Sequence, residues 1–524
     1  MQTFLTSLLE HYHITYEDLR QRSCPGSFMR LRTPFSDPMF QKTILRLKEA
    51  VRTKEKTVIY GDYDVDGLTS TAILKKTLDS LGLNCGYFIP SRYREGYGLV
   101  KERVEDFHKK GYSLLVTVDN GIVAFDAVEL AKSYGMDVIV IDHHEFASKT
   151  VDTPYIFHQK ISHFIDYNCS AASLCLFVSY ALLGHYEEYL ATLAGLAVFS
   201  DVMPLVGNNL ELAKLSLSLL KKNSYPNLLS LIQDHGDELT YEDLSFKIIS
   251  ALNSIGRVES DVMATNRACQ FLIENANPVL ISKYSGYILS VNRKKKELVK
   301  NASIEEKSLL ESSHSFSGII SSLSGLSGLV SNRILREKGK CCCIFAPDEK
   351  DGSLLVGSIR AMEGYDLLGF LEKNRKLFVN AGGHPRALGL TIKKADYYQV
   401  ALLFSTEVEG QALELKGNEE DQPISIALED LNRSNYDIYR MFLPFGEGFR
   451  LPTFEISVDP ENVIVADSKK ASFVYSSDHS SKITYFGVPD MKRSDSSYLT
   501  FSGEFKKEIF RGKVSYVLLS DKVY

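Results

Sequence analysis

The sequence lacks the features that would place the protein in a membrane or outside the cell. No apolar run approaches the ~18 residues that a membrane span needs, and the N-terminal stretch has no basic residue before Arg20, unlike a signal peptide. The eight cysteines are scattered and form no CxxC pair, which favours buried reduced thiols over a disulfide framework or a zinc ribbon. We therefore expect a soluble, cytoplasmic protein with no membrane contact.

The chain also lacks a strong excess of one charge. Its 60 basic and 66 acidic residues give a formal net charge of −6, which argues against a surface that is basic all over for duplex binding. A local groove can still be basic on an acidic chain, so the balance does not decide the partner. With 524 residues, of which 44% are hydrophobic and 24% charged, the chain has the composition of a globular protein with several domains.

The first half of the chain predicts a parallel β-sheet. Between Thr57 and Asp142, short β-rich runs alternate with segments of helical length. Continuous apolar strands separated by amphipathic helices are typical of βαβ units, in which helices cover both faces of a parallel sheet. We therefore predict an α/β fold, and ligands of such sheets gather at the carboxyl ends of the strands.

The remaining sequence predicts a mostly helical part, a charged connecting helix, a second α/β unit and a β-rich end. Lys416–Gln422 is polar and resembles a linker, and the short β-rich segments that follow it are typical of a small barrel. The predicted pieces are an N-terminal lead-in at 1–50, a catalytic domain at 51–277, a connecting helix at 278–312, a second α/β domain at 313–415 and a β-barrel domain at 423–524.

Acidic residues follow three strands of the predicted parallel sheet. The motifs are Gly61–Gly67 (GDYDVDG), Val118–Gly121 (VDNG), Asp142–His144 (DHH) and, after an apolar run of helical length, Ser200–Leu205 (SDVMPL). Carboxylates that crowd together in a half-buried site repel one another unless a cation holds them. An acidic surface turn would explain one such motif, but three at the strand ends of one sheet favour a metal site. Carboxylates with imidazole and no thiolate suit manganese or magnesium better than structural zinc.

This ordered series of motifs resembles that of the DHH phosphoesterase superfamily, and in detail that of its RecJ branch of single-stranded-DNA exonucleases. Further matches occur in the same order at Pro90–Leu99 (PSRYREGYGL), Ala251–Arg257 (ALNSIGR), Gly357–Arg360 (GSIR), Gly382–Gly389 (GGHPRALG) and Pro444–Gly448 (PFGEG). The resemblance implies a DHH domain, a long connecting helix, a DHH-associated domain and a C-terminal OB-fold that binds nucleic acid.

The resemblance also implies roles for single residues. Two divalent metal ions, Mn²⁺ or Mg²⁺, would be bound by Asp64, Asp66, Asp119, His143 and Asp201. His144 would face the phosphate as a donor or acid, and Asp62 is a further catalytic candidate. The substrate-binding residues would be Arg92, Asn253, Arg257, Arg360, Gly382, Gly383 and His384. Arginine suits this role because it bonds a phosphodiester anion through two donors at once.

The implied function is a metal-dependent 5′-to-3′ exonuclease that degrades single-stranded DNA to mononucleotides in repair and recombination. Its expected partners are single-stranded DNA with a 5′ end, and a single-strand-binding protein and a helicase, with the enzyme acting as a monomer. One alternative is a phosphodiesterase of short oligonucleotides or cyclic dinucleotides, and another is a non-catalytic replication scaffold. The smaller relatives typically stop before a β-rich end such as this one, and scaffold relatives typically lose carboxylates that are all present here.

Two segments depart from the family pattern. Residues 145–172 lack the asparagine-proline and glycine-alanine-glycine elements usual after the DHH motif, and Phe449-Arg450 replaces a usual asparagine-proline. Both departures leave the metal-ligand motifs intact, and they indicate a divergent member of the family.

Overall fold

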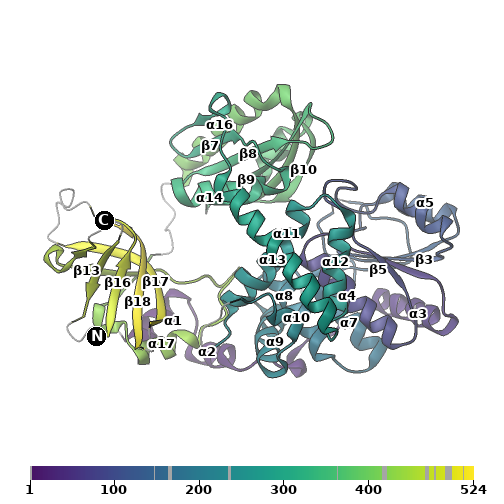
Figure 1. The fold of residues 1–524 in the computed structure, drawn as a ribbon, viewed down its shortest axis with the longest axis horizontal. Coiled ribbons are helices and arrows are strands. Elements are labelled where there is room, and N and C mark those ends of the chain that lie inside the picture. Colours follow the sequence, from purple (N-terminus) through teal and green to yellow (C-terminus); the bar gives the residue numbers. More distant parts are fainter. Residues whose placement is uncertain are drawn as a thin grey trace.

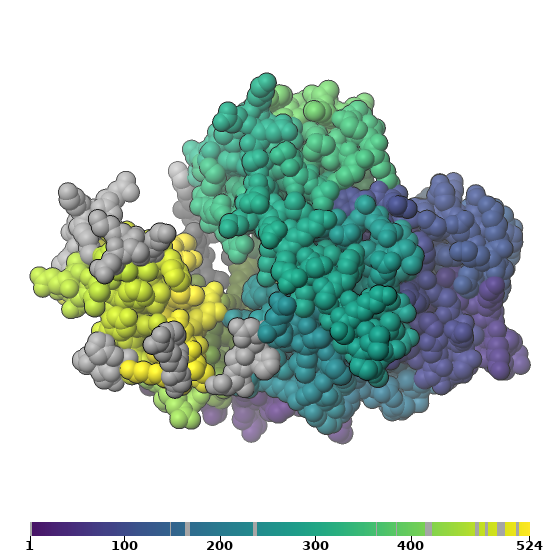
Figure 2. All heavy atoms as spheres, viewed as in Figure 1, coloured from purple at the N-terminus to yellow at the C-terminus, as the bar shows by residue number. Residues whose placement is uncertain are grey.

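Three β-sheets organise the chain and define three units (Figure 1). The computed structural model describes residues 3–146, 148–162, 168–233, 238–362, 364–415, 422–466, 471–476, 480–489, 498–510 and 513–524. We call the units that contain the five-, six- and seven-stranded sheets the first, second and C-terminal units. Figure 2 shows them as separate lobes of the molecular surface. The predicted α/β fold with a parallel sheet is confirmed.

The sheet of the first unit has the strand order β2-β1-β3-β4-β5, and all its pairs are parallel. The strands are β1 (Thr57–Tyr60), β2 (Gly86–Phe88), β3 (Leu114–Val118), β4 (Asp137–Ile141) and β5 (Tyr155–Phe157). Successive side chains point to opposite faces of a strand, so Ile59 joins one hydrophobic core and its neighbours Val58 and Tyr60 join another. The sheet is therefore covered on both faces, as its continuous apolar strands predict.

Helices of the first unit form these two covering layers. One face carries α5 (Lys101–Lys109) and α6 (Phe125–Ser133). The other face and the helical layer beyond it contain α3 (Pro38–Thr53), α4 (Val65–Ser80), α7 (Ala171–Leu183), α8 (Glu188–Ser200), α9 (Gly207–Asn223), α10 (Pro226–Leu229), a π-helical turn (Asp243–Ile249), α11 (Ser250–Val258) and α12 (Val262–Ile273). Most of this layer is apolar on all sides because it is the centre of the largest core.

The connecting helix α13 (Pro278–Asn301) runs from the first unit to the second (Figure 1). Its N-terminus is capped by Asn277, whose side chain accepts hydrogen bonds from the backbone of Val279 and Leu280. The predicted end of the helix at 312 is wrong. The chain leaves the helix after Asn301 because Ile304 then pairs with Ile320 and adds to the edge of the next sheet.

The six-stranded sheet of the second unit has the order β10-β11-β9-β8-β7-β6. Its strands are β6 (Leu310–Glu311), β7 (Ser315–Ile319), β8 (Cys341–Pro347), β9 (Leu354–Arg360), β10 (Phe378–His384) and β11 (Ala387–Lys393), and its helices are α14 (Ser327–Lys338), α15 (Leu368–Lys373) and α16 (Tyr397–Leu415). Only β7 and β8 pair in parallel. The three adjacent cysteines lie in β8, where Cys341 and Cys343 face one core and Cys342 the other.

The C-terminal unit contains a mostly antiparallel sheet with the order β12-β13-β17-β18-β16-β15-β14. Its elements are β12 (Ile424–Ser425), α17 (Arg433–Arg440), β13 (Phe454–Val458), β14 (Ile464–Val465), β15 (Ser472–Tyr475), β16 (Ser481–Tyr485), β17 (Leu499–Phe510) and β18 (Lys513–Val523). The long strands β17 and β18 form its central pair. Most of the predicted linker at 416–422 lies outside the described residues.

The predicted lead-in at 1–50 is divided between two units. Helices α1 (Phe4–His11) and α2 (Tyr16–Ser23) pack on the C-terminal sheet, where Phe4 stacks on Phe454 at a centroid distance of 5.7 Å. Helix α3 instead packs beside β5 in the first unit. The first residues of the chain therefore complete the core of its last unit.

None of the helices in the described part of the chain is long and apolar enough to cross a membrane.

Candidate metal centre

The acidic motifs come together at the carboxyl ends of β1, β3 and β4. These three strands are neighbours in the sheet, so the loops that follow them meet at one edge. Three overlapping sets of side chains have ligand atoms within 4.8 Å of one another: Asp62, Asp64 and Asp119; Asp66, His143 and Asp201; and Asp119, His143 and His144. All five predicted metal ligands lie in these sets, together with both predicted catalytic residues.

The loop after β1 is shaped by the start of helix α4. The carboxylate of Asp64 caps this helix by accepting a hydrogen bond from the backbone of Gly67 at 3.1 Å. Helix α4 therefore begins at Val65, directly after this cap. Gly67 is required here because an added Cβ would lie 2.5 Å from the carbonyl oxygen of Asp62. The tight packing of loop against helix keeps the three carboxylates at one place.

Asp66 is fixed from outside its own loop. Its two carboxylate oxygens accept hydrogen bonds from the backbone of Ala171 at 2.7 Å and of Ala172 at 2.8 Å, at the N-terminus of α7. The positive end of that helix favours a negative charge at this position. This contact is difficult to predict from the sequence, because the donors are backbone groups about a hundred residues away.

His143 is the centre of the ligand group. Its Nε2 atom lies 3.2 Å from Oδ1 of Asp119, 3.5 Å from Oδ2 of Asp201 and 3.6 Å from Oδ2 of Asp66. Asp119 has a left-handed backbone, with φ of 61°, directly after β3. This conformation is uncommon for a residue other than glycine, and such outliers cluster at functional sites.

Asp142 was expected among the acidic residues of a metal site, but in the structure it orients its neighbours and lies outside the ligand sets of the described residues. Its Oδ1 accepts hydrogen bonds from the backbone of His143 at 2.8 Å and of His144 at 3.2 Å, and lies 2.8 Å from Nδ1 of His144. Its Oδ2 accepts from the backbone of Ile122 at 3.0 Å. The side chain is fully buried and holds both histidines of the motif in place. Its position directly after β4 is the signal that could have identified it.

Asp142 and His144 also stabilise each other's charged forms. Burial favours neutral Asp142, but the hydrogen bond and charge of His144 outweigh burial and bring the pKa of Asp142 below its usual value. Burial likewise disfavours the imidazolium, yet Asp142 raises the pKa of His144 to about 9. His144 therefore carries a positive charge near neutral pH and can donate a hydrogen bond to an anion.

The remaining carboxylates lie too close together to be ionised at once without a cation. Burial and the charge of Asp64 raise the pKa of Asp62 to about 8 and that of Asp66 to about 7. Burial and neighbouring carboxylates raise the pKa of Asp119 and Asp201 as well. Oδ1 of Asp62 is buried and accepts no hydrogen bond within the described part of the chain. An unsatisfied oxygen among crowded carboxylates and an imidazole fits a hard divalent cation.

Three of the predicted substrate-binding residues are arginines that approach one another from separate segments. Arg92 lies in the loop after β2, Arg257 on α11 and Arg360 at the end of β9. Burial and the positive charges of Arg92 and Arg360 lower the pKa of Arg257 to about 10. The guanidinium of Arg92 lies 4.5 Å from the centre of the Tyr63 ring, and its buried Nε has no hydrogen-bond partner among the described residues. Such a basic group suits a phosphate.

Asn253 and Arg360 also make contacts within the protein. Asn253 accepts a hydrogen bond from the backbone of Val65 at 3.0 Å and donates one to Ser200 at 3.2 Å. It therefore links the residues next to Asp64 and Asp201. Arg360 donates to Ser358 Oγ at 2.6 Å and to the carbonyl oxygen of Ile359 at 2.7 Å.

The predicted glycine-rich phosphate contact lies in the β10–β11 hairpin of the second unit. Gly383 has φ of 136°, and an added Cβ would lie 2.3 Å from the carbonyl oxygen of Ala387, so glycine is required there. Within the described part of the chain, no hydrogen bond joins Gly382 or Gly383 to the carboxylate group. The side chain of His384 lies outside the described structure.

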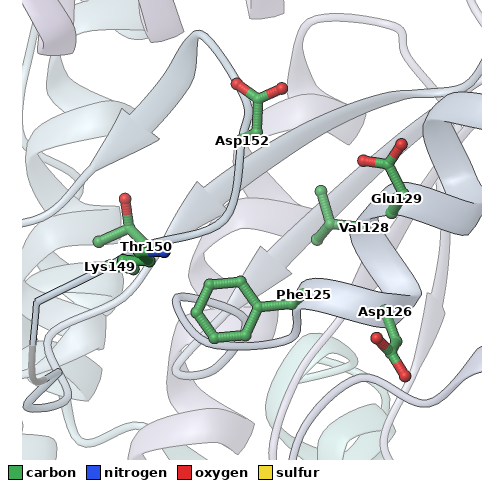
Figure 3. Close-up of a pocket in the computed structure, with 7 residues that line it drawn as sticks. All are labelled: Phe125, Asp126, Val128, Glu129, Lys149, Thr150 and Asp152. Atoms are coloured by element: carbon green, nitrogen blue, oxygen red, sulfur yellow. The ribbon is translucent and has the colours of Figure 1, made fainter.

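A separate surface hollow of about 490 Å³ lies between α6 and residues 149–152 (Figure 3). Three acidic side chains, Asp126, Glu129 and Asp152, line it together with Lys149. An acidic lining repels phosphate, and the residues that line the hollow include none of the predicted site residues. The hollow is therefore distinct from the carboxylate site.

Comparisons with known proteins agree on one family. The model of the DHH family, N-terminal domain, matches residues 56–198. The single-stranded-DNA-specific exonuclease RecJ of Bacillus subtilis is 29% identical over 373 residues, which are 69% of this chain and 47% of that protein. RecJ of Haemophilus influenzae is 25% identical over 456 residues, which are 79% of this chain and 77% of that protein. The chain thus spans about half the length of the Bacillus relative.

The fold is similar to a solved structure as well. A crystal structure of RecJ from Thermus thermophilus in complex with Mn²⁺ superposes with a TM-score of 0.78, at 20% identity, and covers 99% of this chain and 76% of that one. At this identity the match establishes the shared fold.

Proposed function

Because the chain is a RecJ-like member of the DHH superfamily, we propose that it is a metal-dependent 5′-to-3′ exonuclease that hydrolyses single-stranded DNA to mononucleotides. The observation that carries the proposal is the convergence of the overlapping ligand sets at the strand ends, with Arg92 and Arg257 beside the carboxylates and Arg360 beside Arg257. Its proposed setting is DNA repair and recombination in the cytoplasm.

The residues proposed to hold two divalent metal ions are Asp64, Asp66, Asp119, His143 and Asp201. The carboxylate and imidazole donors fit Mn²⁺ or Mg²⁺. Divalent ions held by these residues would acidify a bound water molecule, orient it and neutralise charge on the phosphodiester. The chain contributes the fixed geometry, since Asp66 is held by the α7 N-terminus and His143 by Asp142.

His144 and the arginines act on the phosphodiester itself. His144, charged and oriented by Asp142, donates a hydrogen bond or a proton to a phosphate oxygen. Arg92, Arg257 and Arg360 bind the anion and keep it against the carboxylate group. Asp62 is the further catalytic candidate, and its unsatisfied oxygen and raised pKa suit a role in accepting or releasing a proton.

The other units extend the substrate site. We assign the second unit, with Gly382, Gly383 and His384, to phosphate binding as the DHH-associated domain, at 313–415. We assign the C-terminal unit, at 423–524, to an OB-fold that binds the single strand, with a single-strand-binding protein and a helicase as partners of the monomeric enzyme. In support, most side chains that line a hollow of about 420 Å³ in the C-terminal unit are basic or aromatic, among them Arg433, Tyr436, Lys507 and Tyr516, and Asp437 is its acidic member.

Hydrolysis of a long single strand compared with a dinucleotide tests the proposal. The purified chain is incubated with Mn²⁺ and each substrate, with chelated metal and Asp119→Ala as controls. We expect mononucleotides from the long strand at a rate that exceeds dinucleotide turnover, and no product in either control. Turnover restricted to dinucleotides would instead identify a small-molecule phosphodiesterase. Full activity of Asp119→Ala would show that Asp119 is not part of the catalytic site.

A further inference from the structure

We propose that Arg22, in the N-terminal helix α2, is a positioning residue that connects the C-terminal unit to the metal centre through the turn after Asp201. The proposal deepens the proposed function and rests on it for the activity measurements, while the metal-binding measurement below does not depend on the substrate. Arg22 lies far from the acidic motifs in sequence, and none of those motifs includes it.

The Arg22 guanidinium lies at the meeting point of three segments. Its Nε donates to the carbonyl oxygen of Phe442 at 3.0 Å and its Nη2 to that of Pro444 at 2.5 Å. Its Nη1 approaches the carbonyl oxygen of Leu205 at 3.5 Å. Its Cζ also lies 3.5 Å from the centre of the Phe449 ring. One side chain therefore contacts both the 442–449 loop of the C-terminal unit and the turn of the first unit.

A buried positive charge without a carboxylate partner is unusual at such a place. The Arg22 side chain is buried, and no carboxylate lies within ion-pair distance of it in the described part of the chain. Burial lowers the pKa of Arg22 to about 10. An apolar side chain of similar volume would fill this position without the desolvation of a charge. The presence of an arginine at this buried position is therefore better explained by its three contacts with carbonyl oxygens than by a need to fill space.

The turn that Arg22 contacts leads directly from Asp201. Helix α8 ends at Ser200, and Val202 then adopts a left-handed backbone with φ of 52°, which is strained for a β-branched residue. A strained turn keeps its shape only when its surroundings impose it. The direction of the Asp201 carboxylate thus depends on what holds residues 202–206.

The 442–449 loop provides part of that support. Leu205 is buried, and its backbone N–H donates to the carbonyl oxygen of Glu447 at 2.9 Å. An added Cβ on Gly446 would lie 2.9 Å from Cδ1 of Leu205, so the loop packs closely against this side chain. Arg22 fastens the start of the same loop and the carbonyl group of the same leucine. Loss of Arg22 should therefore loosen the turn and displace Asp201 from the ligand set.

Mn²⁺ binding to the full chain tests this proposal. Arg22→Met keeps the apolar stem of the side chain and removes the donors, and Arg22→Lys keeps the charge but cannot span three carbonyl groups. We expect Arg22→Met to weaken Mn²⁺ binding about tenfold, as is usual when a group that orients a ligand is removed, and Arg22→Lys to have a smaller effect. In single-stranded DNA hydrolysis, kcat should fall while KM stays near the wild-type value.

Tyr12→Phe is the matched control. The Tyr12 hydroxyl donates to the carbonyl oxygen of Arg450 at 2.6 Å, so this variant loosens the same N-terminal contact without touching Leu205. We expect wild-type Mn²⁺ affinity and kcat in Tyr12→Phe. A folded Arg22→Met with the same Mn²⁺ affinity and kcat as the wild type would overturn the proposal, as would an equal loss of affinity in Tyr12→Phe.

Gly446→Ala gives a second, independent variant in case Arg22→Met does not fold. Its added methyl group presses on Leu205 from the loop side and should also weaken Mn²⁺ binding. Unchanged Mn²⁺ affinity in both Gly446→Ala and Arg22→Lys would contradict the proposal. If the wild type proves inactive on single-stranded DNA, the proposed function fails, whereas the comparison of Mn²⁺ affinities still decides the role of Arg22.

Discussion

Nδ1 of His144 lies 2.8 Å from Oδ1 of Asp142, and the same oxygen accepts the backbone hydrogen bonds of both histidines in the DHH motif. The acidic residue of this motif therefore does not join the overlapping ligand sets of the described residues. Asp142 instead orients His143 and His144 and favours the charged form of His144.

Asp142→Asn should impair both catalysis and stability. An asparagine offers a single acceptor oxygen where the aspartate oxygens accept hydrogen bonds on both sides, so at least one buried donor loses its partner. We expect kcat to fall about 10- to 100-fold and the free energy of unfolding to fall by about 1–3 kcal/mol. Steady-state kinetics and urea unfolding measure the two effects.

Asp152→Asn is the control for this substitution. Its side chain is 90% exposed and belongs to none of the ligand sets of the described residues, so we expect kcat and stability near the wild-type values. An Asp142→Asn variant with wild-type kcat would show that His144 needs no carboxylate to act.

The stability of the metal-free protein should fall as the pH rises from about 4 to 8. The pKa of Asp62 is raised to about 8 and that of Asp66 to about 7, whereas in the unfolded chain an aspartate has a pKa of about 3.9. Between these values the folded state binds more protons than the unfolded state, so each rise in pH favours unfolding. Thermal unfolding in a chelating buffer at several pH values measures the slope.

Added Mn²⁺ should stabilise the protein more at pH 8 than at pH 5, because protons compete with the metal for the same carboxylates.

Asp62→Asn should reduce the dependence of stability on pH in the metal-free protein. Stability that is constant or rises over this pH range in chelator would contradict the crowded-carboxylate interpretation.

Arg360→Lys should weaken substrate binding more than catalysis. A lysine can make one of the contacts of the guanidinium but cannot offer two parallel donors to a phosphate. The loss of one charged hydrogen bond corresponds to a rise in KM of about tenfold, with a smaller change in kcat. Kinetics on a single strand measure both, and Arg52→Lys on the exposed face of α3 serves as the control. An unchanged KM would show that Arg360 does not bind the substrate.

Much of the metal centre could be predicted from the sequence because it depends on local order. Apolar strands separated by helices predict a parallel sheet, and a parallel sheet brings its strand ends together. The sequence therefore predicts that Asp119 and His143 lie side by side, and in the structure they do. The ligand set and the arginines came from the resemblance to a known family. Their approach to one another in the structure is consistent with it.

The contacts that support the site could not be predicted in the same way. Asp66 is held by backbone groups of Ala171 and Ala172, which have no side-chain signature. Arg22 contacts Phe442 and Leu205, which are far from it in sequence, and no periodic pattern predicts contacts between such distant residues. Helix α13 ends at Asn301 because Ile304 pairs with Ile320. This pairing is a tertiary interaction, and local helix propensity does not predict it.

Release of label from the two ends of a single strand tests the proposed exonuclease most directly. The purified chain is incubated with Mn²⁺ and the same strand labelled either at its 5′ end or at its 3′ end. We expect the 5′ label to appear in mononucleotides at the earliest times, while the 3′ label stays on strands that shorten progressively. Early release of the 3′ label, or cleavage of a strand that has no free end, would contradict a 5′-to-3′ exonuclease.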